Sequence, residues 1–352
     1  MVEVDRDLEV VVVADIVAVA ADAADRLLTR LNAEKITMTP QKTLNALVVA
    51  LMLASAPSIH AAEPILTAQT VVQKTFASPG ETAQALADAV RANRKSDVLV
   101  IVGPSASSWL WSGDEVADRA DGEKFIAAYD AKHSLSQLAD DKSVLLIGEG
   151  DWPFPAPIIR KAGGWRFDTN AGREEIINRR VGLNELNTIQ TLLAIVDAQR
   201  EYAMADLDGN GYHDYAQRIL SSEGKRDGLY WPVLKGEPLS PLGPQVADAT
   251  RQGYGRQLGS GKLAPYHGYK FRMLTAQGKA AMGGAYSYLV GDKMIGGFAA
   301  IAYPAKYGVS GVMTFKVSHD GAVYEKNIGK LTERSALRMS SFNPDSSWRK
   351  IK

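Results

Sequence analysis

Residues 184–206 read NELNTIQTLLAIVDAQREYAMAD, and this stretch predicts the longest helix of the chain. Its apolar residues are spaced 3, 4 and 3 apart and are Leu186, Ile189, Leu193 and Val196. That spacing places them on one helical face. Asn184 is suited to the N-cap, and Glu185 to the positive end of the helix dipole. We therefore expect a helix that begins after Asn184 and ends near Asp206.

A meander of antiparallel strands is expected after this helix. Apolar and β-branched runs predict five strands, at 269–274, 286–290, 297–303, 311–317 and 323–326. Asp320-Gly321 is typical of a hairpin turn between the last two. A long helix followed by such a meander resembles the element order of type IV pilins and pseudopilins. We expect residues 183–352 to form a C-terminal α+β domain of this kind.

The preceding region predicts a second α+β unit, over residues 76–182. Ser78-Pro79 has the form of a helix start, with Ser at the N-cap and Pro at the first helical position. Strands are expected at 143–147, 158–161 and 165–167, and a short helix at 172–180. Helices followed by a curved sheet are compatible with NTF2-like or cystatin-like folds. This analogy implies no function.

An export signal is predicted inside the N-terminal region. Residues 38–61 read MTPQKTLNALVVALMLASAPSIHA, with a basic Lys42, an apolar run at 44–54, and Ala61 at the expected cleavage position. The run is short for a membrane span, so no stable span is expected after the signal is removed. The sequence favours a mis-called start for residues 1–37, although a genuine cytoplasmic extension is the alternative. Residues 62–75 read as a linker, and the predicted location is periplasmic or secreted.

The composition excludes several classes of function. Lys plus Arg and Asp plus Glu number 40 each, so no basic excess indicates nucleic acid as a partner. The chain has no cysteine, which excludes disulfides, thiolate metal sites and cysteine nucleophiles. Hydrophobic residues make up 46% and charged residues 23%, as in ordinary globular proteins.

Several unusual strings carry a family resemblance. They include GDWPFPAPIIRKAGGWRFDTNAGREEIINRRVGLNEL at 150–186, DGLYWP at 227–232 and PYHGYKFRMLTAQG at 265–278. Together the strings resemble the bacterial exported family called domain of unknown function (DUF) 2950. The likeness runs from about Phe76 to Trp348. It implies no activity, substrate or catalytic residue.

The best candidate for a chemical site is a predicted calcium loop. Oxygen ligands on alternate residues suit Ca²⁺, and Gly211 stands at position 6, where such loops turn sharply. The candidate ligands are Asp206, Asp208, Asn210, Tyr212, Asp214 and Gln217. Gln217 replaces the usual bidentate glutamate, which lowers the expected affinity. The alternative is a capped turn after the helix, whose side chains bind backbone amides.

Two functions of different classes follow from these observations. The first is an exported binding or structural module of the cell envelope, with a calcium-stabilised loop and an envelope protein, glycan or peptide as its partner. The second is a periplasmic hydrolase with its site in a cleft of the N-terminal domain, where His133 lies near Asp168 or Glu174. The sequence leaves enzymatic activity open and favours the module. Among the histidines, His267 is the one most expected to lie in a pocket.

Overall fold

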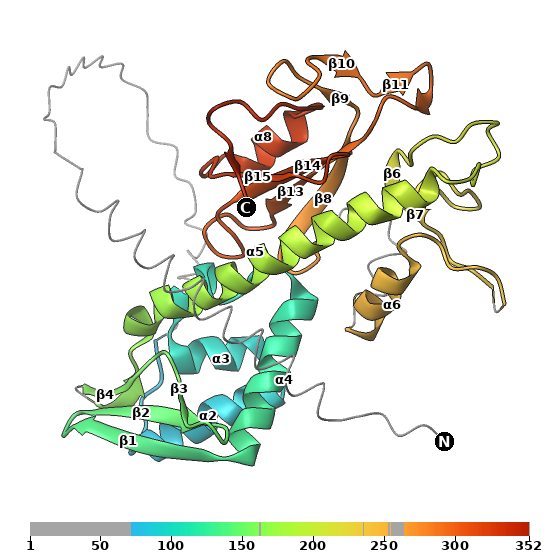
Figure 1. The fold of residues 1–352 in the computed structure, drawn as a ribbon. Helices are drawn as coiled ribbons and strands as arrows, with labels where there is room; N and C mark the ends of the chain where they lie inside the picture. Colours follow the sequence, from blue (N-terminus) through green and yellow to red (C-terminus); the bar gives the residue numbers. More distant parts are fainter. Residues whose placement is uncertain (1–71, 162, 235, 253, 255–263, 352) are drawn as a thin grey trace, which may run out of the picture. The chain divides into compact units, whose positions relative to one another are not determined.

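The computed structural model describes residues 72–161, 163–234, 236–252, 254 and 264–351. This part of the chain forms helices and several mostly antiparallel sheets, so the predicted α+β class is confirmed (Figure 1). Residues 73–352 belong to one compact unit. The predicted extension 1–37, the signal 38–61 and residues 62–71 of the predicted linker lie outside the described residues.

Helices open the described region. They are α2 (Pro79–Arg91), α3 (Lys95–Val102), the 3-10 turn η1 (Pro104–Ser108) and α4 (Glu115–Ala131). The predicted start of α2 is confirmed, because Ser78 Oγ accepts a hydrogen bond from the backbone N of Glu81 at 3.2 Å and Pro79 is the first helical residue. The Asp114 carboxylate caps α4 in the same way and binds the backbone N of Val116 and Ala117.

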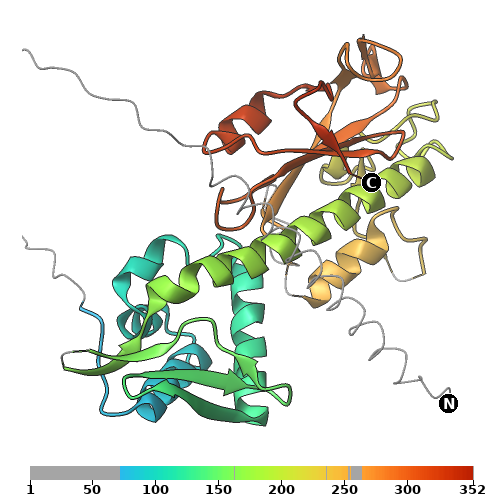
Figure 2. The same cartoon turned by 60° about the vertical axis from the view of Figure 1, so that its left-hand side comes forward.

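The first sheet follows these helices. Its strands are β1 (His133–Ala139), β2 (Lys142–Ile147), β3 (Trp152–Pro153), β4 (Ile158–Lys161) and β5 (Gly164–Phe167), in the order β1-β2-β4-β5 with β3 beside β2. All pairs are antiparallel, and the strands predicted at 143–147, 158–161 and 165–167 are confirmed. Helix α2 packs against β4 and β5, and α4 against β1 and β2 (Figure 2). Leu145, Ile158 and Phe167 are fully buried in the resulting core.

One helix, α5 (Thr169–Tyr202), spans 34 residues and continues past this sheet (Figure 1). The predicted helix start at Asn184 is therefore wrong, since the N-cap of α5 is Asp168 and the helix predicted at 172–180 joins the longer one. The Asn184 amide is buried and donates to the Ser310 carbonyl oxygen at 2.9 Å. A glycine such as Gly182 inside a helix lowers stability by only about 1 kcal/mol. Burial of one large apolar side chain contributes more than this, so Gly182 does not end the helix.

The apolar face of α5 is only partly the predicted one. Val196 is buried, and Ile189 and Leu193 are half-buried against the C-terminal core, as expected. Leu186 is half-buried. The fully buried row is shifted around the helix and contains Leu192, Ile195, Gln199 and Tyr202. Gln199 is accommodated there because its side chain exchanges hydrogen bonds with the backbone of Ala216.

The second large sheet lies beside the C-terminal half of α5. Its strand order is β17 (Arg349–Lys350), β15 (Val323–Lys326), β14 (Thr314–Ser318), β13 (Ala299–Pro304) and β8 (Tyr269–Leu274), all antiparallel. The strands predicted at 269–274 and 323–326 are confirmed. Those predicted at 297–303 and 311–317 begin two or three residues later than expected, at Ala299 and Thr314.

Shorter elements complete this part of the chain. They are β6 (Arg218–Leu220), β7 (Gly228–Tyr230), α6 (Gly243–Arg251), β9 (Ala276–Gln277), β10 (Tyr286–Ser287), β11 (Leu289–Val290), β12 (Lys293–Met294), α8 (Thr332–Arg338) and β16 (Ser341–Phe342). The strand predicted at 286–290 is split into β10 and β11. The split occurs at Tyr288. Its backbone N donates to the carbonyl oxygen of Thr275, and its side chain is fully buried.

A loop between β13 and β14 is held by the middle of α5. Val309 is buried in the N-terminal core although it lies far along the chain. The Glu185 carboxylate, partly buried in mid-helix, accepts hydrogen bonds from the backbone N of Val312 and Met313, each at 2.9 Å. Burial raises the pKa of Glu185, while these two hydrogen bonds lower it. The predicted division at 182–183 thus falls within a helix that contributes to two cores.

We expect the stability conferred by Glu185 to depend on pH. Because the folded-state pKa lies above the usual value of 4.5, ionisation of this carboxyl opposes folding. Relative to Glu185→Gln, the wild type should lose free energy of unfolding as pH rises from 4.5 through the raised pKa. Urea denaturation at a series of pH values measures this difference. Glu174→Gln, at an exposed position of the same helix, should show no such trend. A pH-independent difference for Glu185→Gln would contradict the assignment.

Candidate functional site

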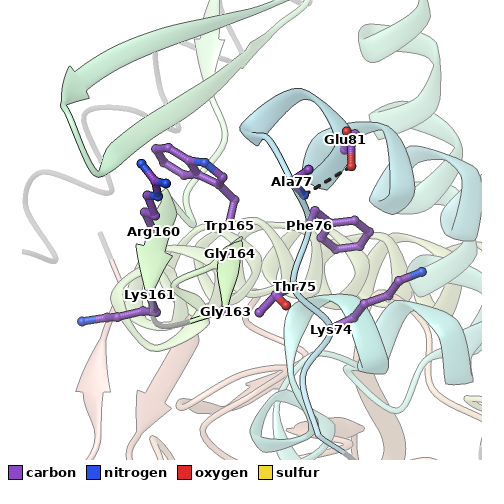
Figure 3. A pocket seen from close by; sticks show the side chains of 10 residues that line it. All are labelled: Lys74, Thr75, Phe76, Ala77, Glu81, Arg160, Lys161, Gly163, Gly164 and Trp165. Atoms are coloured by element: carbon purple, nitrogen blue, oxygen red, sulfur yellow. Dashed lines mark hydrogen bonds between the residues drawn. The ribbon is translucent and has the colours of Figure 1, made fainter.

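An open cavity of about 650 Å³ lies where the chain entering α2 meets the β4–β5 hairpin. Figure 3 shows the side chains that line it. They are Lys74, Thr75, Phe76, Ala77, Glu81, Arg160, Lys161, Gly163, Gly164 and Trp165. The set combines three basic side chains, two aromatic rings and one carboxylate. We call this cavity the basic cleft.

A backbone pairing holds the two walls of the basic cleft together. Phe76 N donates to the Trp165 carbonyl at 2.9 Å, and Trp165 N donates to the Phe76 carbonyl at 2.8 Å. The pairing requires glycine at position 164, because a Cβ there would lie 2.5 Å from the Phe76 oxygen. Gly164 also has a φ of +130°, which other residues rarely adopt. The Gly163-Gly164 turn thus brings together segments that are far apart in the sequence.

The charges of the basic cleft are unbalanced. Among the described residues, no carboxylate lies within ion-pair distance of Lys74, Arg160 or Lys161. The Lys74 ammonium lies over the Phe76 ring, 5.1 Å from its centroid. Among the described residues of the lining, Glu81 carries the one carboxylate, which accepts a hydrogen bond from the backbone N of Ala77 at 3.3 Å (Figure 3). An anion therefore suits the cleft better than a cation.

The residues expected in a hydrolase make local contacts in the structure. His133 Nδ1 lies 2.8 Å from the Tyr129 carbonyl oxygen, and its ring stacks on the Tyr129 ring at 3.9 Å. Asp168 caps α5 through a hydrogen bond from the backbone N of Ala171. Glu174 is exposed on α5. None of His133, Asp168 and Glu174 lines the basic cleft.

The predicted calcium loop forms a network of turns stabilised by side chains. The Asp206 carboxylate accepts hydrogen bonds from the backbone N of Asn210 and Gly211, both at 2.9 Å. The Asn210 amide nitrogen donates to Asp208 at 2.9 Å and to Asp214 at 3.2 Å. These contacts bring the three side chains of Asp208, Asn210 and Asp214 together. Gly211 turns sharply, as expected, with a φ of +85°.

The remaining two predicted ligands are Gln217 and the backbone carbonyl of Tyr212. The Gln217 amide donates to the carbonyl oxygen of Asp292, in the β11–β12 hairpin. The Tyr212 ring is half exposed beneath the Lys293 ammonium, 5.0 Å from its centroid. Burial raises the pKa of Asp214, whereas the Gly211 amide helps to lower that of Asp206. The described residues include no group of three or more His, Asp or Glu placed to hold a metal ion. A calcium site that also uses amide and carbonyl oxygens stays a prediction.

Two buried polar groups were not predicted from the sequence. The Asp114 carboxylate is fully buried and accepts hydrogen bonds from Tyr254 Oη and Gly268 N, both at 2.9 Å. The Lys316 ammonium is buried 3.7 Å from the centroid of the Trp348 ring and donates to the Asn343 carbonyl oxygen. Burial lowers the pKa of Lys316 to about 7. Both groups have satisfied partners, which indicates structural roles.

His267 lies outside the basic cleft. Its ring is half-buried between those of Tyr254 and Tyr266, with centroid distances of 5.8 and 4.2 Å. Burial lowers its pKa. Its φ is +47°, in the left-handed region. The histidine expected in a pocket thus packs beside tyrosines.

A family model described as Protein of unknown function (DUF2950) matches residues 73–351. The chain belongs to this family. The match covers nearly all of the described residues and confirms the resemblance seen in the sequence. No curated protein and no solved structure matches the chain. Within the described residues, no helix has the length and apolarity needed to cross a membrane.

Proposed function

We propose that this DUF2950 member is an exported binding module of the cell envelope, and that its binding site is the basic cleft. The observation that carries this proposal is the convergence of Lys74, Arg160 and Lys161 on one cavity without carboxylate partners among the described residues. Two aromatic rings beside them provide apolar contact area. Pockets that bind small ligands typically combine such surfaces with a few polar groups. The predicted signal at 38–61 supports the location.

Binding is favoured over hydrolysis by the residues of the cleft. General acid–base catalysis requires a titratable group within hydrogen-bond reach of the reacting atom. The described lining contains no histidine, and its one carboxylate, Glu81, binds a backbone amide. The hydrolase candidates His133, Asp168 and Glu174 lie outside the lining. The hydrolase therefore remains the second candidate and has no geometric support of its own.

Attachment to isolated cell envelopes should depend on the basic cleft. We expect Arg160→Ala and Trp165→Leu to lower the affinity in cosedimentation at least tenfold, about 1.4 kcal/mol. Matched controls are Arg338→Ala, at an exposed position, and Trp152→Leu, at a tryptophan that is 56% exposed outside the cleft. These controls should sediment like the wild type. Equal sedimentation of all five proteins would refute the cleft as the envelope-binding site.

We further propose that Ca²⁺ stabilises the loop at 206–217. Support comes from the ligand spacing and from the convergence of Asp208, Asn210 and Asp214. A cation would also offset the repulsion between the two carboxylates. Rotation of the Asn210 amide by 180° would turn its oxygen, rather than its nitrogen, toward those carboxylates and so toward a bound ion.

Calcium should therefore raise the melting temperature of chelated protein. At free Ca²⁺ a hundredfold above the dissociation constant, the gain is about 2.7 kcal/mol. Asp208→Ala should abolish the rise, whereas Asp140→Ala, an exposed carboxylate outside the loop, should retain it. Mg²⁺ should substitute poorly, because it requires a tighter octahedral shell. If calorimetry shows no heat of binding and no shift in melting temperature at millimolar Ca²⁺, the loop at 206–217 is only a capped turn.

Export itself leads to a separate expectation. Signal peptidase should cleave after Ala61 and leave Ala62 as the mature N-terminus. N-terminal sequencing of protein purified from the native host decides this. A periplasmic product that still begins at Met1 would contradict both the signal at 38–61 and the mis-called start.

The finer fold likeness is also part of the proposal. We propose an NTF2-like or cystatin-like arrangement for the helices and sheet that precede α5, and a pilin-like arrangement for the C-terminal half of α5 and the sheet that follows it. The support is the element order, in which helices precede the first sheet and a long helix precedes the second. An experimental structure that superimposes on neither type of fold would refute it.

A further inference from the structure

The basic cleft carries two pairs of an aromatic ring and a cation. Arg160 and Trp165 are directly opposite each other on β4 and β5 and share one face of the hairpin. On the other wall, the Lys74 ammonium lies over the Phe76 ring. Figure 3 shows Arg160 and Trp165 to one side of Gly163 and Gly164, and Lys74 and Phe76 to the other. A ligand that spans the cleft would therefore contact two similar surfaces, each made of one aromatic ring and one cation.

Each pair suits one sugar ring that bears a carboxylate. The apolar face of a pyranose packs on an aromatic ring, and an adjacent guanidinium or ammonium binds a carboxylate. Between the pairs, the Thr75 hydroxyl of the lining can bind a sugar hydroxyl. A bare phosphate would use the cations and leave both rings unused.

Other polymers fit the cleft less well. An extended peptide that added a strand to β5 would need the backbone groups of Trp165, which are already bonded to Phe76. A single-stranded nucleic acid also uses rings and cations. However, domains that bind nucleic acids typically carry a net positive charge, and this chain has equal numbers of basic and acidic residues.

Resting on the proposed function, we infer that the basic cleft binds a glycan that contains neighbouring carboxylate-bearing sugars. Arg160 and Trp165 hold one acidic sugar, and Lys74 and Phe76 hold the next, with Lys161 at the rim. The cavity of about 650 Å³ lies within the range that accommodates a ligand of this size.

Isothermal titration at 0.15 M salt tests this inference on the full chain. The probes are tri-galacturonic and tri-mannuronic acid, their neutral methyl esters, inorganic phosphate and a hexathymidine oligonucleotide. We expect at least one acid trisaccharide to bind tenfold or more tightly than its ester. Arg160→Ala and Phe76→Leu should each weaken that binding at least fivefold, while Arg338→Ala and Trp152→Leu should not change it. Circular dichroism and melting curves verify that each variant is folded.

Three results would overturn the inference. The first is that acids and esters bind equally, or that neither binds. The second is that phosphate or the oligonucleotide binds most tightly. The third is that the cleft variants leave the binding of the acids unchanged. Envelope cosedimentation separates this failure from that of the proposed function. If the envelope is bound through the cleft but no acid trisaccharide is preferred, the glycan assignment is wrong and the binding module stands. If cosedimentation is independent of the cleft, the module itself is refuted.

Discussion

Hydrogen bonds between the middle of α5 and the loop before β14 determine how the described part of the chain is organised. Asn184 binds the carbonyl of Ser310, and Glu185 binds the amides of Val312 and Met313. These bonds satisfy backbone groups that would otherwise lose water without compensation, at about 1–3 kcal/mol each. The same loop places Val309 in the N-terminal core. A short segment of the C-terminal region therefore contributes to the packing of the N-terminal one.

These hydrogen bonds also explain why the sequence prediction of the helix start failed. Asn184-Glu185 resembles a helix start, because asparagine favours the N-cap and glutamate the first turn. The same side chains serve a tertiary contact about 126 residues away in the sequence, and local propensity does not distinguish these uses. Where the determinants are local, as with the Ser78 cap and the hairpin that follows Ile158, prediction and structure agree. The strand predicted across Tyr288 failed because that residue bonds with Thr275 and is buried.

The two candidate sites differed in predictability for a similar reason. The candidate ligands of the loop at 206–217 lie close together in the sequence, so their spacing alone was enough to predict a calcium site there. The basic cleft joins Lys74 and Phe76 to a hairpin about 85 residues later, through contacts that include the bridge between Phe76 and Trp165. The sequence contained one local sign of it, the Gly163-Gly164 turn beside a tryptophan. Nothing in that sign identifies which segment packs against the hairpin.

Gly164 links the stability of the first sheet to the proposed binding surface. A side chain at this position would meet the Phe76 carbonyl oxygen and would have to adopt a strained φ. The bridge would then open, and Phe76 would move away from β5. Lys74 and Thr75 precede Phe76 directly, so one wall of the cleft would move with it. The cleft therefore depends on backbone pairing as much as on its charges. Substitutions that preserve every basic side chain can still abolish the site by separating its two walls.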